Sequence, residues 1–305
     1  MSSATTETTR RTATEAEGGD ATKPAAALSL PGPAPAHPSP WLAVMTLARR
    51  EIVRFLRQKH RVFGAVGQPA LFWLLFGTGF DASFQNPYVA SDGFSQYFFP
   101  GTLVLITLFT SIFTTFSIIS DRNEGFLQGV LVAPAPRWAM VFGKVLGGTV
   151  LATLQAGLFL LAAPLIGIKV GVAGMLAALA ALALISFALT AMGFCLAWRM
   201  DSIQGFHAIM MVFLLPMWLL SGAFFPAAGA NPVLAWIIRL NPLTYGVAAV
   251  RRLLTSAATA PGSGVMPAAE LPALGLSLAI VLGFGVLMMA LATRIAARPL
   301  EGVKG

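Results

Sequence analysis

Six long apolar stretches occur along the chain from residue 62 onward, and none shows the period-two alternation of membrane β-strands. They cover residues 62–80, 98–119, 145–168, 172–198, 203–225 and 273–293. Each has roughly 20 or more residues, which at about 1.5 Å per helical residue matches a hydrocarbon core about 30 Å thick. Because backbone polar groups in a bilayer must be satisfied internally, we expect helices. The pattern predicts an all-α, polytopic membrane protein with six transmembrane helices.

The composition agrees with this class, because 56% of the residues are hydrophobic and only 10% are charged. A soluble fold of 305 residues would lack polar surface with such a content. If both termini are cytoplasmic, the inner segments after residue 40 hold thirteen Lys and Arg residues and the outer segments hold four. This difference follows the positive-inside rule and explains the net charge of +8 without a nucleic-acid partner. We therefore expect a multi-pass protein of the bacterial inner membrane with both termini in the cytoplasm.

The two ends of the chain differ from the membrane domain, which we place at residues 62–298. Residues 1–40 are rich in Thr, Ala, Gly and Pro and cannot bury enough apolar area to offset the entropy of ordering, so a disordered cytoplasmic tail is expected. Residues 299–305 form a short cytoplasmic tail. The single cysteine, Cys195, lies inside the fourth apolar stretch, where it is interpreted as a small packing residue without an intrachain disulfide.

Residues 41–61 have the pattern of a basic amphipathic helix. At 100° per residue, one face is apolar and consists of Trp41, Met45, Ala48, Ile52 and Phe55. The opposite face is basic and consists of Arg50, Arg54, Arg57 and Arg61. Such a helix is expected to lie at the cytoplasmic membrane surface, with its arginines on anionic lipid headgroups. An ordinary positively charged flank of the first span is the alternative.

The inner loop at residues 120–144 has helix signals of its own. Asp121 and Glu124 have the spacing of a capping box. The side chains of Leu127, Val130 and Leu131 follow as an apolar stripe, and the prolines at 134 and 136 end the helix. A short helix in this position could insert into a groove on a soluble partner and transmit a push to the adjacent spans. It could equally rest on the headgroups.

The outer region at residues 226–254 contains apolar runs that are too short to cross a bilayer. We expect two short helices that dip into the outer leaflet around a break at Asn241 and Pro242, with Asn241 as the cap of the second helix and Pro242 as its first residue. A purely structural interfacial hairpin is the alternative. For Arg251 and Arg252, contact with lipid phosphates and plain solvation both stay open.

The spans contain few polar groups, and none has Asp, Glu, Lys or Arg near its centre. This absence argues against an ion-coupled transporter, which would need an embedded ion site. His207 is expected to be buried and hydrogen-bonded, and Pro216 is expected to kink its helix. A phosphate-binding loop is also missing, because Gly143 and Lys144 are followed by Val145 and lack the upstream glycine. The chain therefore cannot hydrolyse ATP alone.

Two groups of motifs resemble those of a known family. The inner loop contains DRNEGFL at 121–127, LVAP at 131–134, then Arg137 and GK at 143–144, and the outer region contains LSGAFFP at 220–226 and NPLTY at 241–245. In this order they resemble the type-2 ABC exporter permeases, especially the daunorubicin-resistance-like branch. The resemblance runs from about residue 41 to 298. Asn123 and Gln128 depart from the residues that are frequent in the family.

The resemblance implies a six-helix subunit that dimerises, most simply as a homodimer, and pairs with two copies of a separate cassette ATPase. ATP and Mg²⁺ would be held by that ATPase, and this chain would carry no cofactor or metal. The helix that couples the two proteins would comprise Asp121, Arg122, Glu124, Gly125, Phe126, Leu127, Val130 and Leu131. The outer gate would comprise Asn241, Pro242 and Tyr245.

The leading interpretation is thus a non-enzymatic permease that exports an amphipathic, drug-like or lipid-like substrate with the energy of a partner ATPase. Export of a glycan or glycolipid by the same architecture is an alternative. A secondary carrier or channel, and a membrane assembly factor without transport, are two further alternatives from other classes.

Overall fold

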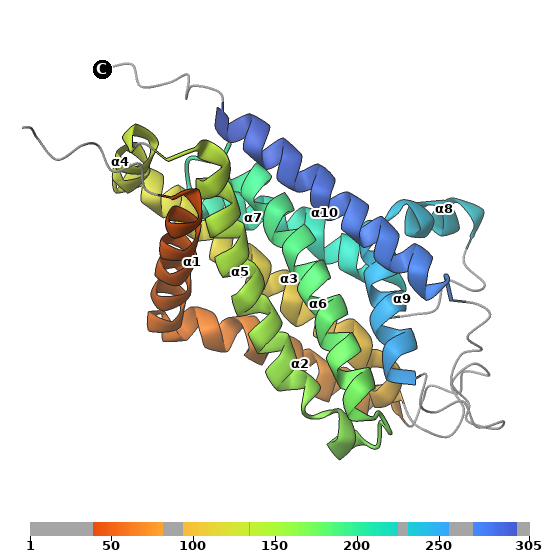
Figure 1. Ribbon diagram of the computed structural model, residues 1–305. Coiled ribbons are helices and arrows are strands. Elements are labelled where there is room, and N and C mark those ends of the chain that lie inside the picture. Colours follow the sequence, from red (N-terminus) through yellow and green to blue (C-terminus); the bar gives the residue numbers. More distant parts are fainter. Residues whose placement is uncertain (1–38, 82–93, 134, 225–230, 256–270, 298–305) are drawn as a thin grey trace, which may run out of the picture. The chain divides into compact units, whose positions relative to one another are not determined.

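The computed structural model describes residues 39–81, 94–133, 135–224, 231–255 and 271–297 (Figure 1), and these segments contain helices and turns but no strand. This confirms the predicted all-α class. Residues 1–38 and 298–305 lie outside the described residues, as do the predictions made for the two tails.

Six helical segments of the described chain are long and apolar enough to cross a membrane, as predicted. They are α2 (Lys59–Asp81), α3 (Phe94–Asn123), α5 (Arg137–Leu160) with the short 3₁₀ helix η1 (Ala163–Ile166), α6 (Val172–Ala197), α7 (Ile203–Trp218) with the π-helical segment η2 (Leu219–Ala223), and α10 (Leu274–Ala297). The remaining helices are α1 (Pro40–Arg57), α4 (Phe126–Val132), α8 (Pro232–Leu240) and α9 (Pro242–Thr255). We call the end of the bundle where α3 ends and α5 begins the α4 end, and the end where α3 begins the Phe94 end.

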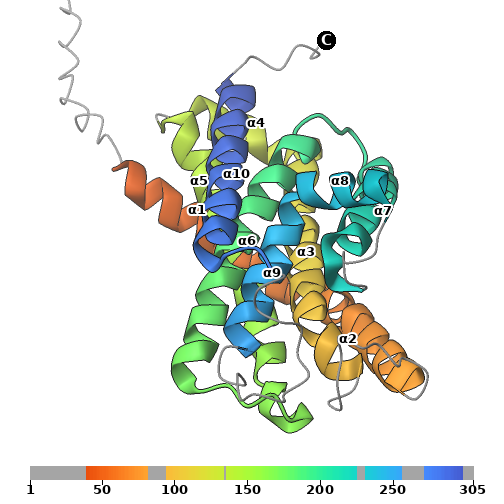
Figure 2. The same cartoon turned by 90° about the vertical axis from the view of Figure 1, so that its right-hand side faces the viewer.

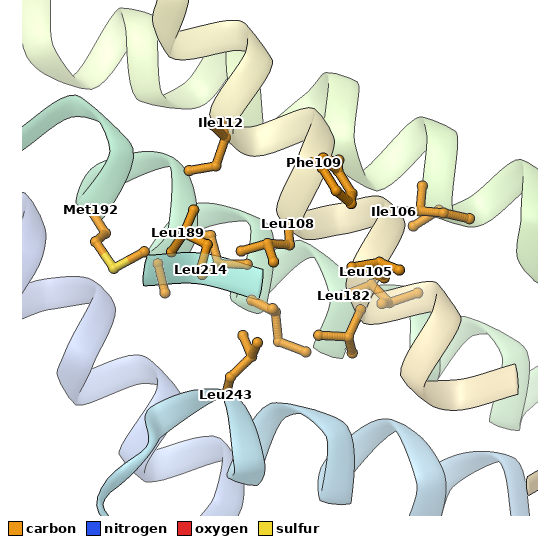
Figure 3. Packing of buried hydrophobic residues seen from close by; sticks show 14 of the residues in the cluster. Leu105, Ile106, Leu108, Phe109, Ile112, Leu182, Leu189, Met192, Leu214 and Leu243 are labelled. Atoms are coloured by element: carbon orange, nitrogen blue, oxygen red, sulfur yellow. The ribbon is translucent and has the colours of Figure 1, made fainter. Parts of the chain in front are cut away.

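Helix α3 is the centre of the packing, because almost all of it is buried, whereas α2, α7 and α10 leave most of their surface open. Leucine, isoleucine and phenylalanine side chains of α3 meet those of α6, α7 and α9 (Figure 3), as Leu108, Leu189 and Leu243 illustrate. Some hydroxyls of α3 are satisfied within the helix, since Thr102 and Thr107 each donate to the carbonyl four residues earlier, whereas Thr110 donates to the Gln155 side chain of α5. The buried helix can therefore carry these hydroxyls in the core with hydrogen-bond partners.

The basic amphipathic helix exists as α1, but it is shorter than predicted. It begins after the cap Ser39, whose hydroxyl accepts from the Leu42 amide at 3.2 Å, and it ends at Arg57. The chain turns at Gln58, and α2 starts at Lys59 in a different direction (Figure 1). Arg61 therefore belongs to the first span and not to the amphipathic helix.

The predicted helix of the inner loop is divided in two. Helix α3 continues through Asp121 to Asn123, and Gly125 then adopts a left-handed conformation with φ of 76° before α4 begins at Phe126. The capping box is therefore wrong, because Asp121 lies within the last turn of α3 and not at the start of a new helix. Glycine tolerates this positive φ without the strain that a Cβ would add.

The short helices of the outer region also exist, and α8 and α9 meet at an angle of 80°. The predicted cap is confirmed: the Asn241 side chain accepts from the Leu243 amide at 3.0 Å, and Pro242 is the first residue of α9. The π-helical segment η2 follows Pro216 closely, so the span departs from a regular α-helix near this proline as expected. Helix α8 contacts η2, the segment that continues α7 (Figure 2).

Two polar side chains of the spans were predicted with different success. Cys195 is buried, and its thiol lies 3.4 Å from the Met288 carbonyl oxygen, which agrees with a packing residue. The prediction for His207 is wrong, because its side chain is exposed and rests against the rings of Phe113 and Phe116. The imidazole lies on the open side of α7, where it needs no buried hydrogen-bond partner.

Candidate functional site

The candidate site lies at the α4 end, where α1 packs closely on α5. Two glycines of α5 allow this contact: a Cβ on Gly143 would lie 2.9 Å from the Val44 carbonyl oxygen, and a Cβ on Gly147 would lie 2.8 Å from the Glu51 Cβ. Real Cβ atoms essentially never come this close to other heavy atoms. These two glycines therefore determine which face of α1 can approach α5.

The buried face of α1 consists of Val44, Ala48, Glu51 and Phe55. The predicted apolar face shares Ala48 and Phe55 with it, but Trp41 and Met45 are exposed. The difference arises because Gly143 and Gly147 allow close packing against a face of α1 that is rotated from its most apolar face. As a result, Glu51, an acidic residue of this basic helix, is buried on the side that faces α5.

Asp121 is the centre of a charged cluster that joins three helices. Its carboxylate is fully buried and accepts two hydrogen bonds from the Arg50 guanidinium, at 2.9 and 3.0 Å. Arg54 of α1 and Lys144 of α5 also donate to it. The hydrogen bonds to Asp121 raise the pKa of the Arg50 guanidinium above its ordinary value, although partial burial acts in the opposite direction. Arg50 thus stays charged throughout the accessible pH range.

Lys144 completes the cluster from the side of α5. Its ammonium group is 4% exposed and lies 3.5 Å from a Glu51 carboxylate oxygen and 3.5 Å from the Ser117 hydroxyl. Glu51, Asp121 and Glu124 balance the three cations of the cluster, so its formal charge is zero. Pairing of this kind offsets the large cost of removing ionic groups from water.

Helix α4 is attached directly to this cluster. Glu124, in the turn before α4, accepts from Arg54 at 3.0 Å. The Arg50 guanidinium lies 3.6 Å from the centre of the Phe126 ring, a cation–π contact, and Leu127 is buried. Because Arg50 and Arg54 contact both α3 and the start of α4, a displacement of α4 is mechanically linked to α1.

The outer surface of α4 is open. Gln128 and Val132 are exposed, Val130 is half-buried, and the side chain of Leu131 lies outside the described residues. Between α1, α4 and the start of α5 there is a groove of about 490 Å³ with apolar walls. Its lining includes Leu42, Leu47, Phe126, Val130 and Met140. The site therefore combines a rigidly attached short helix with an apolar groove beside it.

Three predicted residues lie apart from the cluster. Arg122 points away from Asp121 and donates to the Ala197 and Trp198 carbonyls at the end of α6, at 3.1 and 2.7 Å. Arg57 is exposed on α1, and the Arg61 guanidinium lies 5.3 Å from the centre of the Phe116 ring. The predicted basic face is thus divided: Arg50 and Arg54 pair with acids of the protein, whereas Arg57 stays on the surface.

The predicted gate residues lie in the α8–α9 hairpin. Asn241 caps α9 and also donates to the Met217 carbonyl at 2.6 Å, and the Tyr245 hydroxyl donates to the Arg239 carbonyl at 3.0 Å. Both interpretations of Arg251, lipid contact and solvation, are wrong. Its side chain is 4% exposed and contacts Tyr97 and Gly222, because carbonyl groups at the start of α3 and in η2 attract it inward.

Glu51 and Lys144 are functional candidates that the sequence interpretation missed. Lys144 was considered as a positive charge next to a span and as part of a Gly-Lys motif, but not as a partner of Asp121. Glu51 was overlooked among the arginines that surround it in the sequence. A signal did exist: one acid stands in the middle of a basic helix, and one lysine stands between Gly143 and the apolar run that begins at Val145. Within the described residues, no cluster of His, Cys, Asp or Glu has the composition of a metal site.

Comparison with known families matches residues 43–255 to the ABC-2 type transporter family. A protein of Cyanophora paradoxa, named as transport permease ycf38, is 27% identical over 212 residues, which cover 69% of this chain and 73% of that protein. The ycf38 protein of Porphyra purpurea is 24% identical over 220 residues, which cover 70% and 74%. An Escherichia coli K12 protein named as multidrug ABC transporter permease YbhR is 27% identical over 168 residues, which cover 53% of this chain and 44% of that protein. The family match includes the Asp121 cluster, α4 and the α8–α9 hairpin.

Proposed function

The chain belongs to the ABC-2 type transporter family and is a multi-pass membrane subunit of a transporter, and we propose that it is the permease of an ATP-driven exporter. The observation that carries the proposal is the attachment of α4. This short helix has an exposed outer surface, and its base is connected through Arg50, Arg54 and Asp121 to α1 and α3, and through Lys144 to α5.

Such an attachment is suited to transmit force. A partner that moves α4 would move α3 directly, because only Glu124 and Gly125 separate the two helices. It would also move α1 and α5, since separating them from α3 would leave buried charges unpaired. Small movements at a docking site then become rigid-body movements of packed helices.

The driving partner is a cassette ATPase in two copies, which holds ATP and Mg²⁺. The sequence of this chain has no phosphate-binding loop, so the hydrolysis is assigned to that separate subunit. The permease acts as a homodimer. The apolar side chains that α2 and α7 expose, such as Leu71, Leu75 and Phe213, are available for contact with a second copy and with lipid. The α4 end faces the cytoplasm of a bacterial cell, in agreement with the distribution of Lys and Arg.

The exported substrate is an amphipathic, drug-like or lipid-like molecule. The apolar surfaces of the spans suit such a molecule better than an ion. The related YbhR protein is named as a multidrug permease, which supports the same substrate class. A glycan or glycolipid is the second candidate, since its export uses the same architecture. A secondary carrier would instead transport without an ATPase.

The first experiment is gentle purification of the full chain with its native associates. We expect a cassette ATPase in an equal molar amount. Reconstitution of this complex into proteoliposomes should then give ATP-dependent movement of a hydrophobic fluorescent drug such as ethidium. Movement that persists without nucleotide and stops when the proton gradient collapses would refute the proposal in favour of a secondary carrier.

A matched pair of variants tests the role of α4. Glu124→Gln removes the acid at the base of α4, and Asp201→Asn removes an acid that is 96% exposed and pairs with Arg122. Both pairs involve exposed acids, so neither change should cost more than about 1 kcal/mol of stability. We expect Glu124→Gln to reduce drug-stimulated ATP hydrolysis by about fivefold or more, and Asp201→Asn to leave it unchanged. Equal stimulation in both variants would remove the Glu124 turn from the coupling mechanism.

A further inference from the structure

The last part of the fifth span contains an irregular segment. Helix α7 passes at Leu219 into η2, and Gly222 within it has φ of 76°, the left-handed region. In a regular helix the Gly222 carbonyl would accept from the amide of residue 226, but this residue is a proline and has no amide hydrogen. Because a bilayer offers no water to such a carbonyl, its donor has to come from another part of the protein.

Arg251 of α9 supplies that donor. Its guanidinium donates to the Gly222 carbonyl at 3.1 Å and to the Tyr97 carbonyl at 3.4 Å, and it lies 4.2 Å from the centre of the Tyr97 ring. The Arg251 side chain thus connects α9 to the start of α3 and to the irregular end of the fifth span. The Tyr97 hydroxyl adds a weak contact to the same Gly222 carbonyl, at 3.5 Å.

The electrostatics of this contact are unusual. Arg251 is 4% exposed, and within the described residues no carboxylate accepts a hydrogen bond from it. Its charge is instead stabilised by two carbonyl dipoles and the face of an aromatic ring. A buried charge in a membrane-spanning region is expensive and usually has a functional reason. Arg251 was not among the predicted gate residues, although Asn241 and Tyr245 lie on the same hairpin.

We propose that Arg251 is a positioning residue that holds the Phe94 end of the pathway closed by clasping α9 to Gly222 and Tyr97. When α3, α7 and α9 separate, the guanidinium loses both carbonyls and the ring, and the Gly222 carbonyl loses its donor. The free-energy cost of losing these contacts favours the closed arrangement until a force from the α4 end overcomes it. The link to export rests on the proposed function, whereas the clasp itself does not.

Substitutions at Arg251 and Gly222 test the clasp. Arg251→Gln removes the charge and the reach of the guanidinium, and Gly222→Ala disfavours the left-handed conformation while its Cβ would meet nothing within 4 Å. The matched controls are Arg239→Gln, an exposed arginine of the same hairpin, and Gly283→Ala, a glycine of α10 whose Cβ would also meet nothing within 4 Å. The full chain is reconstituted without nucleotide into vesicles loaded with self-quenching carboxyfluorescein, and dye release is recorded.

We expect vesicles with the native chain and with both controls to stay tight. Gly222→Ala should increase dye release about 5- to 30-fold, the factor that corresponds to the cost of a left-handed non-glycine residue. Arg251→Gln should increase it about tenfold or more, because the Gly222 carbonyl loses its stronger donor and keeps only the weak contact with the Tyr97 hydroxyl. Since both changes act on one contact, the double variant should leak no faster than the faster single variant. Arg251→Lys should leak less than Arg251→Gln, because its ammonium can still reach one carbonyl.

The proposal is overturned if Arg251→Gln and Gly222→Ala melt at the native temperature and their vesicles stay as tight as those of the native chain. It is also overturned if the two controls leak equally, since leakage would then report general disturbance. The dye assay uses no ATPase. If the variant vesicles stay tight but the native chain exports with ATP, the clasp is refuted and the proposed function stands. If the variant vesicles leak but the native chain shows no ATP-driven export, the clasp stands and the proposed function is refuted.

Discussion

Replacing Asp121 with Asn should destabilise the permease more than any other single charge removal in the described cluster, because Asp121 is the acid that all three cations share. The substitution keeps the shape of the side chain and removes one negative charge from a neutral group of six. Breaking a buried ion pair on one side costs about 3–5 kcal/mol.

The structure places the effect at the lower end of that range. The Arg50 and Arg54 side chains are 31% and 22% exposed and can turn toward water when the carboxylate is gone. Lys144 is only 4% exposed and keeps one acid, Glu51, at 3.5 Å. We therefore expect a loss of about 3 kcal/mol. With about 2–4 °C per kcal/mol for chains of this order of size, the melting temperature should fall by about 6–12 °C.

The assay is thermal unfolding of the purified protein in detergent, followed by tryptophan fluorescence. Asp201→Asn is the matched control, since the same chemical change on an exposed side chain should stay within about 0.5 kcal/mol. The double variant Asp121→Asn with Lys144→Met keeps the cluster formally neutral and should cost less than the sum of the two single variants, with a coupling energy of about 1–3 kcal/mol. A melting temperature of Asp121→Asn within about 1 °C of the native value, or strictly additive effects in the double variant, would refute this account of the cluster.

Two further substitutions test the packing at each end. Gly147→Ala should lower the melting temperature and expose α1 to protease, because the new Cβ collides with Glu51, at a typical overpacking cost of about 1–3 kcal/mol; Gly283→Ala, at an open position, should lack this effect. Asn241→Ala should cost about 2–3 kcal/mol in the same melting assay, because α9 loses its cap and the Met217 carbonyl loses a donor. Asn231→Ala, which removes only the cap of exposed α8, should cost about 1 kcal/mol, and equal losses for the two asparagines would contradict the role of the Met217 contact.

Properties that depend on residues close together in the chain were predictable from the sequence. The number of spans follows from the length of apolar runs, and the cap of α9 follows from the order Asn241, Pro242, because both depend on local geometry. The short inner helix was placed correctly by the prolines after it. Its start was not, because the capping box assumed that Asp121 would satisfy nearby amides.

Long-range contacts explain that error. The Asp121 carboxylate binds Arg50 and Lys144, which lie 71 and 23 residues away in the chain. No local pattern indicates such partners. The same reason applies to α1, where periodicity identified an amphipathic helix but not the face that Gly143 and Gly147 select. Sequence periodicity describes one helix at a time, whereas buried faces are chosen by the neighbouring helix.

The arginine contacts at the two ends of the bundle differ in a way that suits a gate driven from one end. At the α4 end, Arg50 faces a carboxylate within a neutral cluster, and separating these helices would leave full opposite charges unpaired. At the Phe94 end, Arg251 faces two carbonyl groups and a ring, whose partial charges hold it less strongly. When α4 is pushed, the contacts among α1, α3 and α5 should therefore outlast those among α3, α7 and α9. The bundle is expected to move as one body at the driven end and to part at the other.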